Sequence, residues 1–300
     1  MVDPLGEIIA LLKPQAVLSK LISGAGRWGV RYGDYGAPSF CTVIDGRCRL
    51  AVDGQGPVTI EAGDFILMPA TPGFVLSGFE PVIPRFIDPH AAPPPIEELR
   101  HGDPDAVPDV RLLGGYFSFA SRDTELLVSL LPQLIHVRGV DRLSALVAMV
   151  GEETRNARPG RDLVLERLVE VLLVEALRAT QGETAPPGLL RGLGDRRLAA
   201  AMRAMHADPA RAWTMGELGR SAGMSRSTFF DHFSRAVGVP PMEYLLAWRM
   251  ALAKDLLRGR KFALAEVAER VGYGSASTFS TAFSRHVGQP PGRFARCGVA

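Results

Sequence analysis

The sequence predicts an α+β protein that begins with a β-barrel carrying accessory helices and ends with an all-α domain holding two helix-turn-helix units. Three observations predict this class: short alternating apolar segments between Trp28 and Ile87, an internal repeat in the last third of the chain, and opposite net charges in its two halves. Three hundred residues is also about twice the usual length of a single domain. We therefore expect two domains, each with its own core.

The N-terminal half shows the pattern of a sheet. Alternating apolar segments at residues 41–44, 48–52 and 65–68 are separated by Gly, Pro and Asp, and Asp45-Gly46 and Asp53-Gly54 are turn signals. A further strand is expected at residues 112–119, with helices after it. Residues 91–108 are rich in proline and charge, which indicates a connection between elements.

A helix with an apolar stripe is expected just before a linker. The stripe repeats at helical spacing and consists of Leu165, Leu168, Val169, Leu172, Leu173, Ala176 and Leu177. It either pairs two subunits into a homodimer or covers the barrel. Glycine and proline within residues 182–188 then mark a linker. We therefore expect a first domain at residues 1–181, a linker at 182–193 and a second domain at 194–300.

Composition favours a globular protein of the cytoplasm with no membrane partner. Hydrophobic residues make up 47% of the chain, and no apolar run approaches the about 20 residues that span a bilayer. Asp3 and Glu7 stand where a secretory signal would carry basic residues. Cys41, Cys48 and Cys297 form no CxxC pair, which is typical of a reducing compartment.

The small net charge of +2 conceals two halves of opposite sign. From Arg191 onward there are 17 Lys and Arg against 8 Asp and Glu, a charge of +9, and the residues before Arg191 carry −7. Clustered positive charge attracts a phosphate backbone through counterion release. The C-terminal part is therefore the candidate for binding nucleic acid.

The C-terminal half contains an internal duplication. Residues 227–229 (Ser-Thr-Phe) and 233–235 (Phe-Ser-Arg) return fifty residues later at 277–279 and 283–285. Upstream, Gly223 matches Gly272 at an offset of forty-nine, so the second copy has one residue more in its turn. Each copy is predicted to form two helices around a Gly-containing turn, with Gly-x-Pro-Pro as a stop.

Local chemistry supports two helix-turn-helix units. Thr214 and Glu217 have capping-box spacing, and Ser225 and Ser275 can each cap the helix that follows. The second helix of each copy has an apolar face, made of Phe229, Phe233 and Val237 and of Phe279, Phe283 and Val287. A striped helix at residues 241–257 would join the copies rigidly, so that both second helices enter successive major grooves about 34 Å apart.

Residues 198–294 resemble the DNA-binding domain of the AraC/XylS family of transcription regulators. The most specific matches are residues 268–273 (Ala-Glu-Arg-Val-Gly-Tyr), 277–279 with Phe283, and 287–291 (Val-Gly-Gln-Pro-Pro). The resemblance implies base-facing roles for Ser227, Phe230 and Asp231 in the first copy and for Ser277, Thr278, Ser280 and Thr281 in the second. Phosphate contacts are expected from Arg226, Arg235, Arg249 and Arg285, each of which could instead be an ordinary solvated or intramolecular arginine.

The N-terminal half resembles the cupin-type barrel that begins one subgroup of these regulators, with Gly63-Asp64 through Pro69 as the most specific match. Cupin barrels can hold a metal through His and carboxylate ligands, but no histidine precedes His90, so we expect no metal and no cofactor. The barrel is expected either to bind a small-molecule effector or to serve in packing and dimerisation. Cys41 and Cys48 could lie on adjacent strands and respond to oxidants, or could be two small core residues.

Together these features predict a sequence-specific DNA-binding transcription regulator with a cupin-like first domain and no catalytic residues. Its partners would be double-stranded promoter DNA, an effector and, for an activator, RNA polymerase; activation and repression both stay open. The leading rival is a cupin-type metal-dependent enzyme with an accessory helical domain. A third interpretation is a protein that coats DNA nonspecifically, whose affinity would fall with salt but barely vary among sequences.

Overall fold

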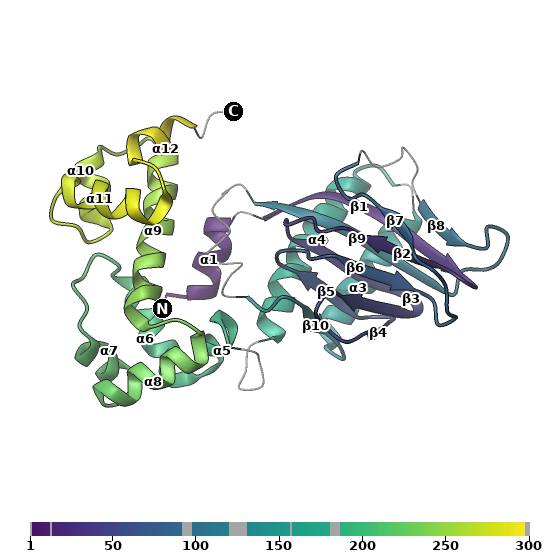
Figure 1. Ribbon diagram of the computed structural model, residues 1–300, viewed down its shortest axis with the longest axis horizontal. Coiled ribbons are helices and arrows are strands. Elements are labelled where there is room, and N and C mark those ends of the chain that lie inside the picture. Colours follow the sequence, from purple (N-terminus) through teal and green to yellow (C-terminus); the bar gives the residue numbers. More distant parts are fainter. Residues whose placement is uncertain are drawn as a thin grey trace. The chain divides into compact units, whose positions relative to one another are not determined.

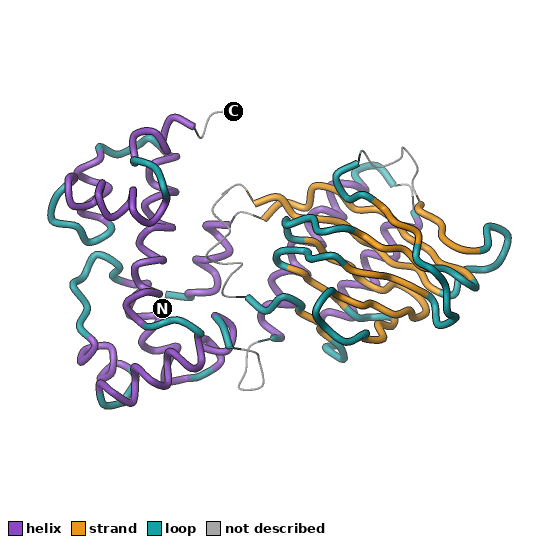
Figure 2. The backbone as a smooth tube through the Cα atoms, in the orientation of Figure 1, coloured by secondary structure: helices purple, strands orange, loops and turns teal. Residues whose placement is uncertain are grey.

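The computed structural model describes residues 2–12, 14–91, 98–119, 131–156, 158–180 and 187–297. They fall into two compact units, each taken by itself below. The sheet unit contains the described parts of residues 14–119 and 132–180, and the helical unit contains residues 2–12 and 187–297. Figure 2 distinguishes the strands of the first unit from the helices of the second, which agrees with the predicted α+β class.

In the described part of the chain, the sheet unit holds ten strands. These are β1 (Pro14–Ala25), β2 (Gly29–Tyr32), β3 (Ser39–Val52), β4 (Val58–Glu61), β5 (Phe65–Met68), β6 (Phe74–Ser77), β7 (Arg85–Ile87), β8 (Glu98–Gly102), β9 (Val110–Phe119) and β10 (Ile135–Val137). They pair in the order β7-β2-β6-β3-β9-β1-β8, with β4 and β5 on β3 and β10 on β5. The sheet is mixed, since β7 and β8 pair parallel to β2 and β1.

Strand β3 curls this sheet into a half-barrel because it pairs with different strands along its length. Its first part pairs with β5 and β9, and its last part pairs with β4 and β6. The Asp45-Gly46 signal was predicted as a turn, and that prediction is wrong: Gly46 lies inside β3 at a bulge, with φ of 75°. A Cβ at Gly46 would lie 1.8 Å from the Asp109 carbonyl oxygen, so glycine is required for this close approach.

Two other expectations about strands have different outcomes. Asp53-Gly54 does form the turn between β3 and β4, with Gly54 at φ of 79°. Residues 91–108 were predicted as a connection only, but they contain β8, which pairs parallel to β1. The charged segment of β8 carries no alternation of its own, so its strand conformation depends on pairing with β1.

Two helices cover one side of the sheet, α3 (Asp141–Arg155) and α4 (Arg161–Ala179) (Figure 1). The predicted apolar stripe of α4 packs inside the unit, against α3, β1 and β5. Leu165, Val169, Leu172, Leu173, Ala176 and Leu177 are all buried there. Of the two roles left open for this stripe, the structure shows that it covers the sheet.

Asp64, in the segment most typical of the cupin-type barrel, anchors the last strand of the sheet. Its buried carboxylate accepts hydrogen bonds from His136 Nε2 at 2.8 Å, from Arg138 Nη2 at 2.8 Å and from the Glu61 N–H at 3.0 Å. Burial alone would raise the pKa of Asp64, but these hydrogen bonds together hold it below its ordinary value. The network ties β10 to the turn that precedes β5.

Cys41 and Cys48 both lie on β3, so the alternative that places them on adjacent strands is wrong. Both side chains are buried. Burial raises the pKa of the Cys48 thiol to about 12 and raises that of Cys41 as well. At neutral pH both are protonated thiols, as expected of small core residues.

The helical unit is made of α1 (Pro4–Leu12), α5 (Leu189–Gly194), α6 (Arg196–Ala207), α7 (Met215–Ser221), α8 (Arg226–Val237), α9 (Pro241–Gly259), α10 (Leu264–Arg270), α11 (Ala276–Val287) and α12 (Pro291–Cys297). No helix among the described residues is long and apolar enough to cross a membrane.

Two segments near the predicted boundaries pack in the helical unit. Helix α1, within the predicted first domain of residues 1–181, packs on α6 and α9 because Leu5 and Ile8 are buried there. The linker predicted at 182–193 includes most of α5, whose Leu189 and Leu190 are buried in the helical unit. The start of that linker, residues 182–186, lies outside the described residues.

Candidate nucleic-acid interface

The helical unit contains two helix-turn-helix units, α7–α8 and α10–α11, and their second helices begin in the same way. Ser225 caps α8 by accepting from the Thr228 N–H at 3.3 Å, and Ser275 caps α11 by accepting from the Thr278 N–H at 3.1 Å. Each serine also hydrogen-bonds the threonine hydroxyl, at 2.8 and 2.7 Å. Both predicted caps are therefore confirmed, and each satisfies an amide left free at a helix start.

The turns of the two units also match, despite the extra residue in the second. Gly223 has φ of 64° and Gly272 has φ of 82°, the left-handed region that favours glycine. The N–H of each donates at 3.0 Å to the carbonyl three residues earlier, at Arg220 and Glu269. The two copies found in the sequence therefore also share the backbone geometry of their turns.

Each second helix is fixed by a pair of buried phenylalanines. The rings of Phe229 and Phe233 lie 5.5 Å apart at 56°, and those of Phe279 and Phe283 lie 5.5 Å apart at 54°. All four side chains are fully buried. Because the apolar face is fixed in the core, the opposite face of each helix must point outward.

The residues predicted to face bases do lie on these outward faces. Six of them are exposed: Ser227, Phe230, Asp231, Ser277, Thr278 and Thr281. Ser280 is half-buried. Phe230 is 44% exposed, which is unusual for a large aromatic side chain and leaves its ring free for an apolar contact.

Two of the hydroxyls on α11 already have partners within the helix. Thr278 Oγ1 is engaged with the capping Ser275, and Thr281 Oγ1 donates to the Ser277 carbonyl at 3.1 Å. A threonine that donates to its own backbone still offers its oxygen lone pairs and its methyl group. The Thr281 side chain can therefore accept a hydrogen bond through its oxygen and make an apolar contact through its methyl group.

A groove of about 780 Å³ lies alongside α8, and it brings together residues that the sequence placed far apart. Ser227, Asp231 and Arg235 line it from α8, and Arg196 and Arg197 line it from the start of α6. Both of these arginines are exposed, and sequence reasoning missed them. The sequence did contain a sign of them. Asp195 is a residue type that often caps a helix, and the two arginines after it place positive charge at that helix start.

One side of this groove is held in place by a hydrogen bond between α8 and the start of α6. His232 Nε2 lies 2.6 Å from Asp195 Oδ2, which joins α8 to the cap of α6. Burial would raise the pKa of Asp195, but hydrogen bonds from His232 and from the N–H groups of Arg197 and Leu198 hold it below its ordinary value. The carboxylate therefore stays ionised and fixes the two helices relative to each other.

The four arginines predicted to contact phosphate differ in their surroundings. Arg226, Arg235 and Arg285 are exposed at the two second helices. Arg249 instead donates from Nε to the Pro209 carbonyl at 2.7 Å and from Nη2 to the Arg211 carbonyl at 2.8 Å. Its guanidinium fastens the loop before α7 to α9, which is the intramolecular alternative for this residue.

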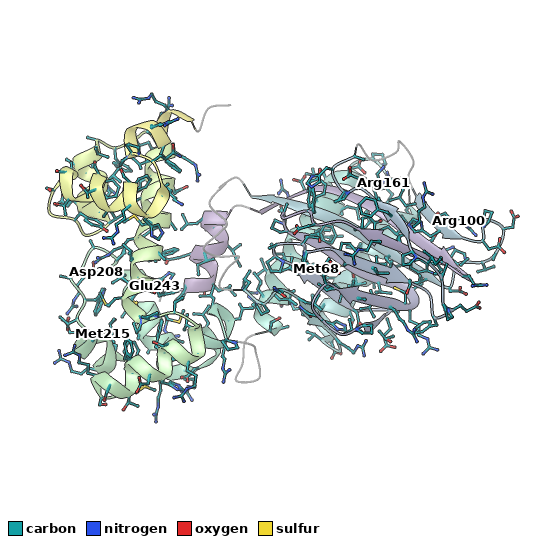
Figure 3. All side chains as sticks on the ribbon, in the orientation of Figure 1. Met68, Arg100, Arg161, Asp208, Met215 and Glu243 are labelled. Carbon is teal, nitrogen blue, oxygen red and sulfur yellow. The ribbon has the colours of Figure 1, made fainter. Side chains whose placement is uncertain are left out.

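Helix α9 separates the two helix-turn-helix units. It was predicted at residues 241–257, and it spans Pro241–Gly259, from Glu243 in its first turn to Arg258 in its last (Figures 1 and 3). Nineteen helical residues extend about 28 Å. Tyr244, Leu245 and Trp248 are buried near its start and Ala253 and Leu257 near its end, so each end is packed into a core.

Comparisons with known proteins agree with this architecture. A cupin family model matches residues 3–181, and a helix-turn-helix domain model matches residues 218–296. A putative AraC-like transcription regulator of Streptomyces lividans is 36% identical over 97% of both chains. One of Streptomyces antibioticus is 36% identical over 97% of this chain and 98% of its own.

Among solved structures, the chain is similar to the DNA-binding domain of the transcription factor AdpA in complex with a target DNA. The identity is 26% with a TM-score of 0.32, over 33% of this chain and 89% of that one. The full-length relatives and the two family models carry the assignment. The chain belongs to the AraC-like family of DNA-binding transcription regulators, with a cupin-type N-terminal domain and a helix-turn-helix C-terminal domain.

Proposed function

We propose that this regulator recognises specific promoter sequences by placing α8 and α11 in successive major grooves of one DNA duplex. The observation that carries the proposal is the equivalence of the two helices, which share their caps, their buried phenylalanine pairs and an outward polar face. The extent of α9, about 28 Å, is comparable with the about 34 Å of one helical turn of DNA. Such a pair can read two half-sites on one side of the duplex.

The proposed roles follow from the chemistry of each exposed side chain. On α8, Phe230 contacts a thymine methyl group and Asp231 accepts from a cytosine amino group, beside Ser227. On α11, Thr281 and Ser277 give direct base contacts, while Thr278 and Ser280 support them. The exposed arginines Arg226, Arg235 and Arg285 bind phosphates, which positions the protein without specifying sequence.

A paired substitution tests this assignment. Thr281→Ala should relax the preference at one position of the site, by about tenfold against the wrong base, and leave nonspecific affinity unchanged. Arg285→Ala should weaken binding to all sequences alike and lower the salt slope of the binding constant by about 1. Randomised-site selection followed by titrations at several salt concentrations measures both. Equal losses on every DNA for both variants would contradict the base-reading role of Thr281.

The same titrations separate the regulator from the two rival interpretations. A protein that only coats DNA would show affinities that fall with salt but barely differ between a selected and a scrambled site. The cupin-enzyme interpretation is disfavoured by full-length relatives that are named as transcription regulators. Among the described residues, no three His, Cys, Asp or Glu side chains gather to hold a metal ion.

We further propose that the sheet unit binds a small-molecule effector that modulates DNA affinity. The support is a cavity of about 860 Å³ inside the half-barrel, a size typical of small-molecule sites. For an activator, contact with RNA polymerase would follow DNA binding. Homodimerisation would use apolar residues left outside the core, such as Val164 and Val171, which lie two turns apart on α4 and are each 42% exposed.

A further inference from the structure

A run of exposed apolar side chains lies between β6 and β7. Residues 79–86 carry four large apolar side chains that are all exposed: Phe79, Val82, Ile83 and Phe86. Ile83 is 93% exposed and Phe86 is 64% exposed. The segment leads into β7, which stands at one end of the pairing order of the sheet (Figure 1). Single apolar residues are normal at a surface, but four within eight residues form a patch of the kind that marks a contact surface.

The packing of this segment on β2 keeps the patch at the surface. A Cβ at Gly29 would lie 2.9 Å from Val82 Cγ1, and a Cβ at Gly33 would lie 3.5 Å from the ring of Phe86. Both apolar side chains therefore lie over glycines. Pro81 and Pro84 fix the backbone φ on either side of Val82 and Ile83. The segment is thus held in one shape that presents Ile83 to the outside.

Arginines border the patch. Four of them are exposed: Arg27, Arg47, Arg49 and Arg85. The guanidinium carbons of Arg47 and Arg49 lie 5.2 and 5.1 Å from the centre of the Phe79 ring. These two arginines are two residues apart on β3, with the buried Cys48 between them, so both point away from the core. The aromatic ring therefore holds two positive charges beside the apolar side chains.

The carboxylates near these arginines already have partners. Glu80 Oε2 lies 3.7 Å from Arg27 Nε, and Arg27 also donates to the Pro81 carbonyl at 3.0 Å. Glu61, on the neighbouring strand β4, lies 3.1 Å from Arg138 Nη1. The two arginines of β3 make no ion pair with any residue that the structure describes. The patch is therefore apolar and positively charged.

This combination fits an anionic lipid surface better than a protein. Two copies of the patch would meet with like charges face to face, so charge disfavours self-association. Pro81 and Pro84 lack the N–H groups that a strand added by a partner would need. A bilayer requires neither shape complementarity nor strand pairing. Its anionic headgroups attract arginines, and the boundary of its acyl chains takes up apolar side chains.

We propose that the sheet unit binds anionic membrane surfaces through residues 79–86. Ile83 and Phe86 enter the boundary between headgroups and acyl chains, and Arg47 and Arg49 contact the lipid phosphates. Each arginine near an anionic surface strengthens binding about fivefold, and burial of an Ile or Phe side chain adds about tenfold or more. This interaction goes beyond DNA recognition and does not depend on it.

Cosedimentation of the full chain with lipid vesicles tests the proposal. Vesicles of phosphatidylglycerol and phosphatidylcholine in equal parts are compared with vesicles of phosphatidylcholine alone, in about 0.15 M salt. We expect the anionic vesicles to bind at least about tenfold more tightly. Equal affinity for the two compositions, or no binding to either, would overturn the proposal.

Apolar variants test insertion. The double variant Ile83→Ser/Phe86→Ser should bind anionic vesicles at least about tenfold more weakly than the wild type. The matched control is Met149→Ser/Leu163→Ser, which removes two exposed apolar side chains from α3 and α4 and should bind as the wild type does. Melting temperatures confirm that both variants fold. Equal losses in the two double variants would refute the assignment to residues 79–86.

Charge variants test the role of the arginines. Arg47→Gln/Arg49→Gln should weaken binding to anionic vesicles at least about tenfold and leave the weaker binding to phosphatidylcholine unchanged. Arg142→Gln/Arg158→Gln removes two exposed arginines elsewhere in the sheet unit and should have a smaller effect. A loss as large in this control would show that net charge, rather than the patch, attracts the lipid.

A fluorescent label separates insertion of the patch from attraction of the basic helical unit to lipid. In a Cys297→Ser background, the buried Cys41 and Cys48 leave the Ile83→Cys thiol as the accessible one for an environment-sensitive dye. Its emission should rise and shift to shorter wavelength on anionic vesicles, whereas the same dye at Leu163→Cys should not respond. An equal response at both positions would contradict insertion through this segment.

Two further measurements exclude other roles of the patch. Light scattering should give the same mass for the wild type and for Ile83→Ser/Phe86→Ser. If the variant were a monomer and the wild type a dimer, the patch would be an interface between copies and the proposal would be wrong. The same variant should bind the selected DNA site as the wild type does, so that its loss of vesicle binding is separate from DNA recognition.

Discussion

Glu7 Oε2 lies 2.9 Å from His206 Nδ1, and the other ring nitrogen of His206 lies 2.7 Å from the Tyr244 hydroxyl. These three residues belong to α1, α6 and α9, so the contact joins the first helix of the chain to the DNA-binding unit. The imidazole is fully buried and stacks on Trp248 with centroids 4.0 Å apart. A neutral ring that donates from Nδ1 and accepts at Nε2 satisfies all three groups.

The packing of α1 predicts that a substitution near the start of the chain lowers the stability of the helical unit. Ile8 is 3% exposed, and its truncation by Ile8→Ala should lower the free energy of unfolding of the helical unit by about 2 kcal/mol or more. Urea titration followed by the fluorescence of Trp213 and Trp248, both in the helical unit, in a Trp28→Phe background measures the change. The matched control is Ile83→Ala, because Ile83 is 93% exposed in the sheet unit. An Ile8→Ala effect no larger than that control would show that α1 does not stabilise the helical unit.

The buried imidazole predicts a loss of stability in mild acid. Burial lowers the pKa of His206 from 6.5 to about 3, so below pH 6.5 the unfolded chain takes up a proton that the folded chain does not. Its contribution is full above pH 6.5 and is lost as the pH falls, by about 2 kcal/mol at pH 5. Burial, and then Asp3, raise the pKa of Glu7, which acts in the opposite sense but nearer its ordinary value of 4.5.

Substitution of His206 isolates this effect. His206→Gln removes the titrating group, so its loss of stability between pH 7 and pH 5 should be smaller than that of the wild type by about 2 kcal/mol. Denaturant titrations at both pH values give the difference. Identical pH dependence in the two proteins would mean that His206 is not held neutral.

The groove beside α8 predicts a phosphate contact outside the recognition helices. Arg196→Ala should reduce affinity for every DNA by about 3- to 10-fold and lower the salt slope by about 1, because Arg196 lines the groove with Ser227 and Asp231. Titrations with selected and scrambled DNA at several salt concentrations test this. Arg111→Ala is the control, since its exposed arginine lies in the sheet unit. A loss confined to the selected sequence would argue for base reading by Arg196 instead.

The raised thiol pKa values predict slow modification of both core cysteines. A rise from 9.0 to about 12 at Cys48 reduces the thiolate fraction at pH 8 by about a thousandfold. In a Cys297→Ser background, the folded protein should react with a thiol reagent at least about a hundredfold more slowly than the denatured protein. Fast labelling in native buffer would restore the oxidant-sensing alternative.

The duplicated helix-turn-helix units could be predicted from sequence because their signals are local. Capping serines, turn glycines and the phenylalanine period all act within a few residues, and the repeat supplies each signal twice. Strand β8 could not be predicted, since its conformation comes from pairing with β1, a distant segment. The Asp45-Gly46 pair was misassigned because a glycine at positive φ serves a bulge as well as a turn.

For the candidate site too, local features could be predicted from the sequence and features that depend on tertiary contacts could not. The outward position of Thr281 follows from the helical period, whereas the anchoring of Arg249 by the Pro209 and Arg211 carbonyls depends on how a loop folds back on α9. The cavity of the sheet unit joins residues from β2, β7 and β8 that no short motif connects.

Helix α1 packs with the last third of the chain, on α6 and α9. A fragment that starts after the linker would lack Glu7, the partner of His206, and would expose the apolar surface on which Leu5 and Ile8 pack. A DNA-binding fragment should therefore be expressed together with residues 2–12, supplied as a peptide or joined by a short artificial loop.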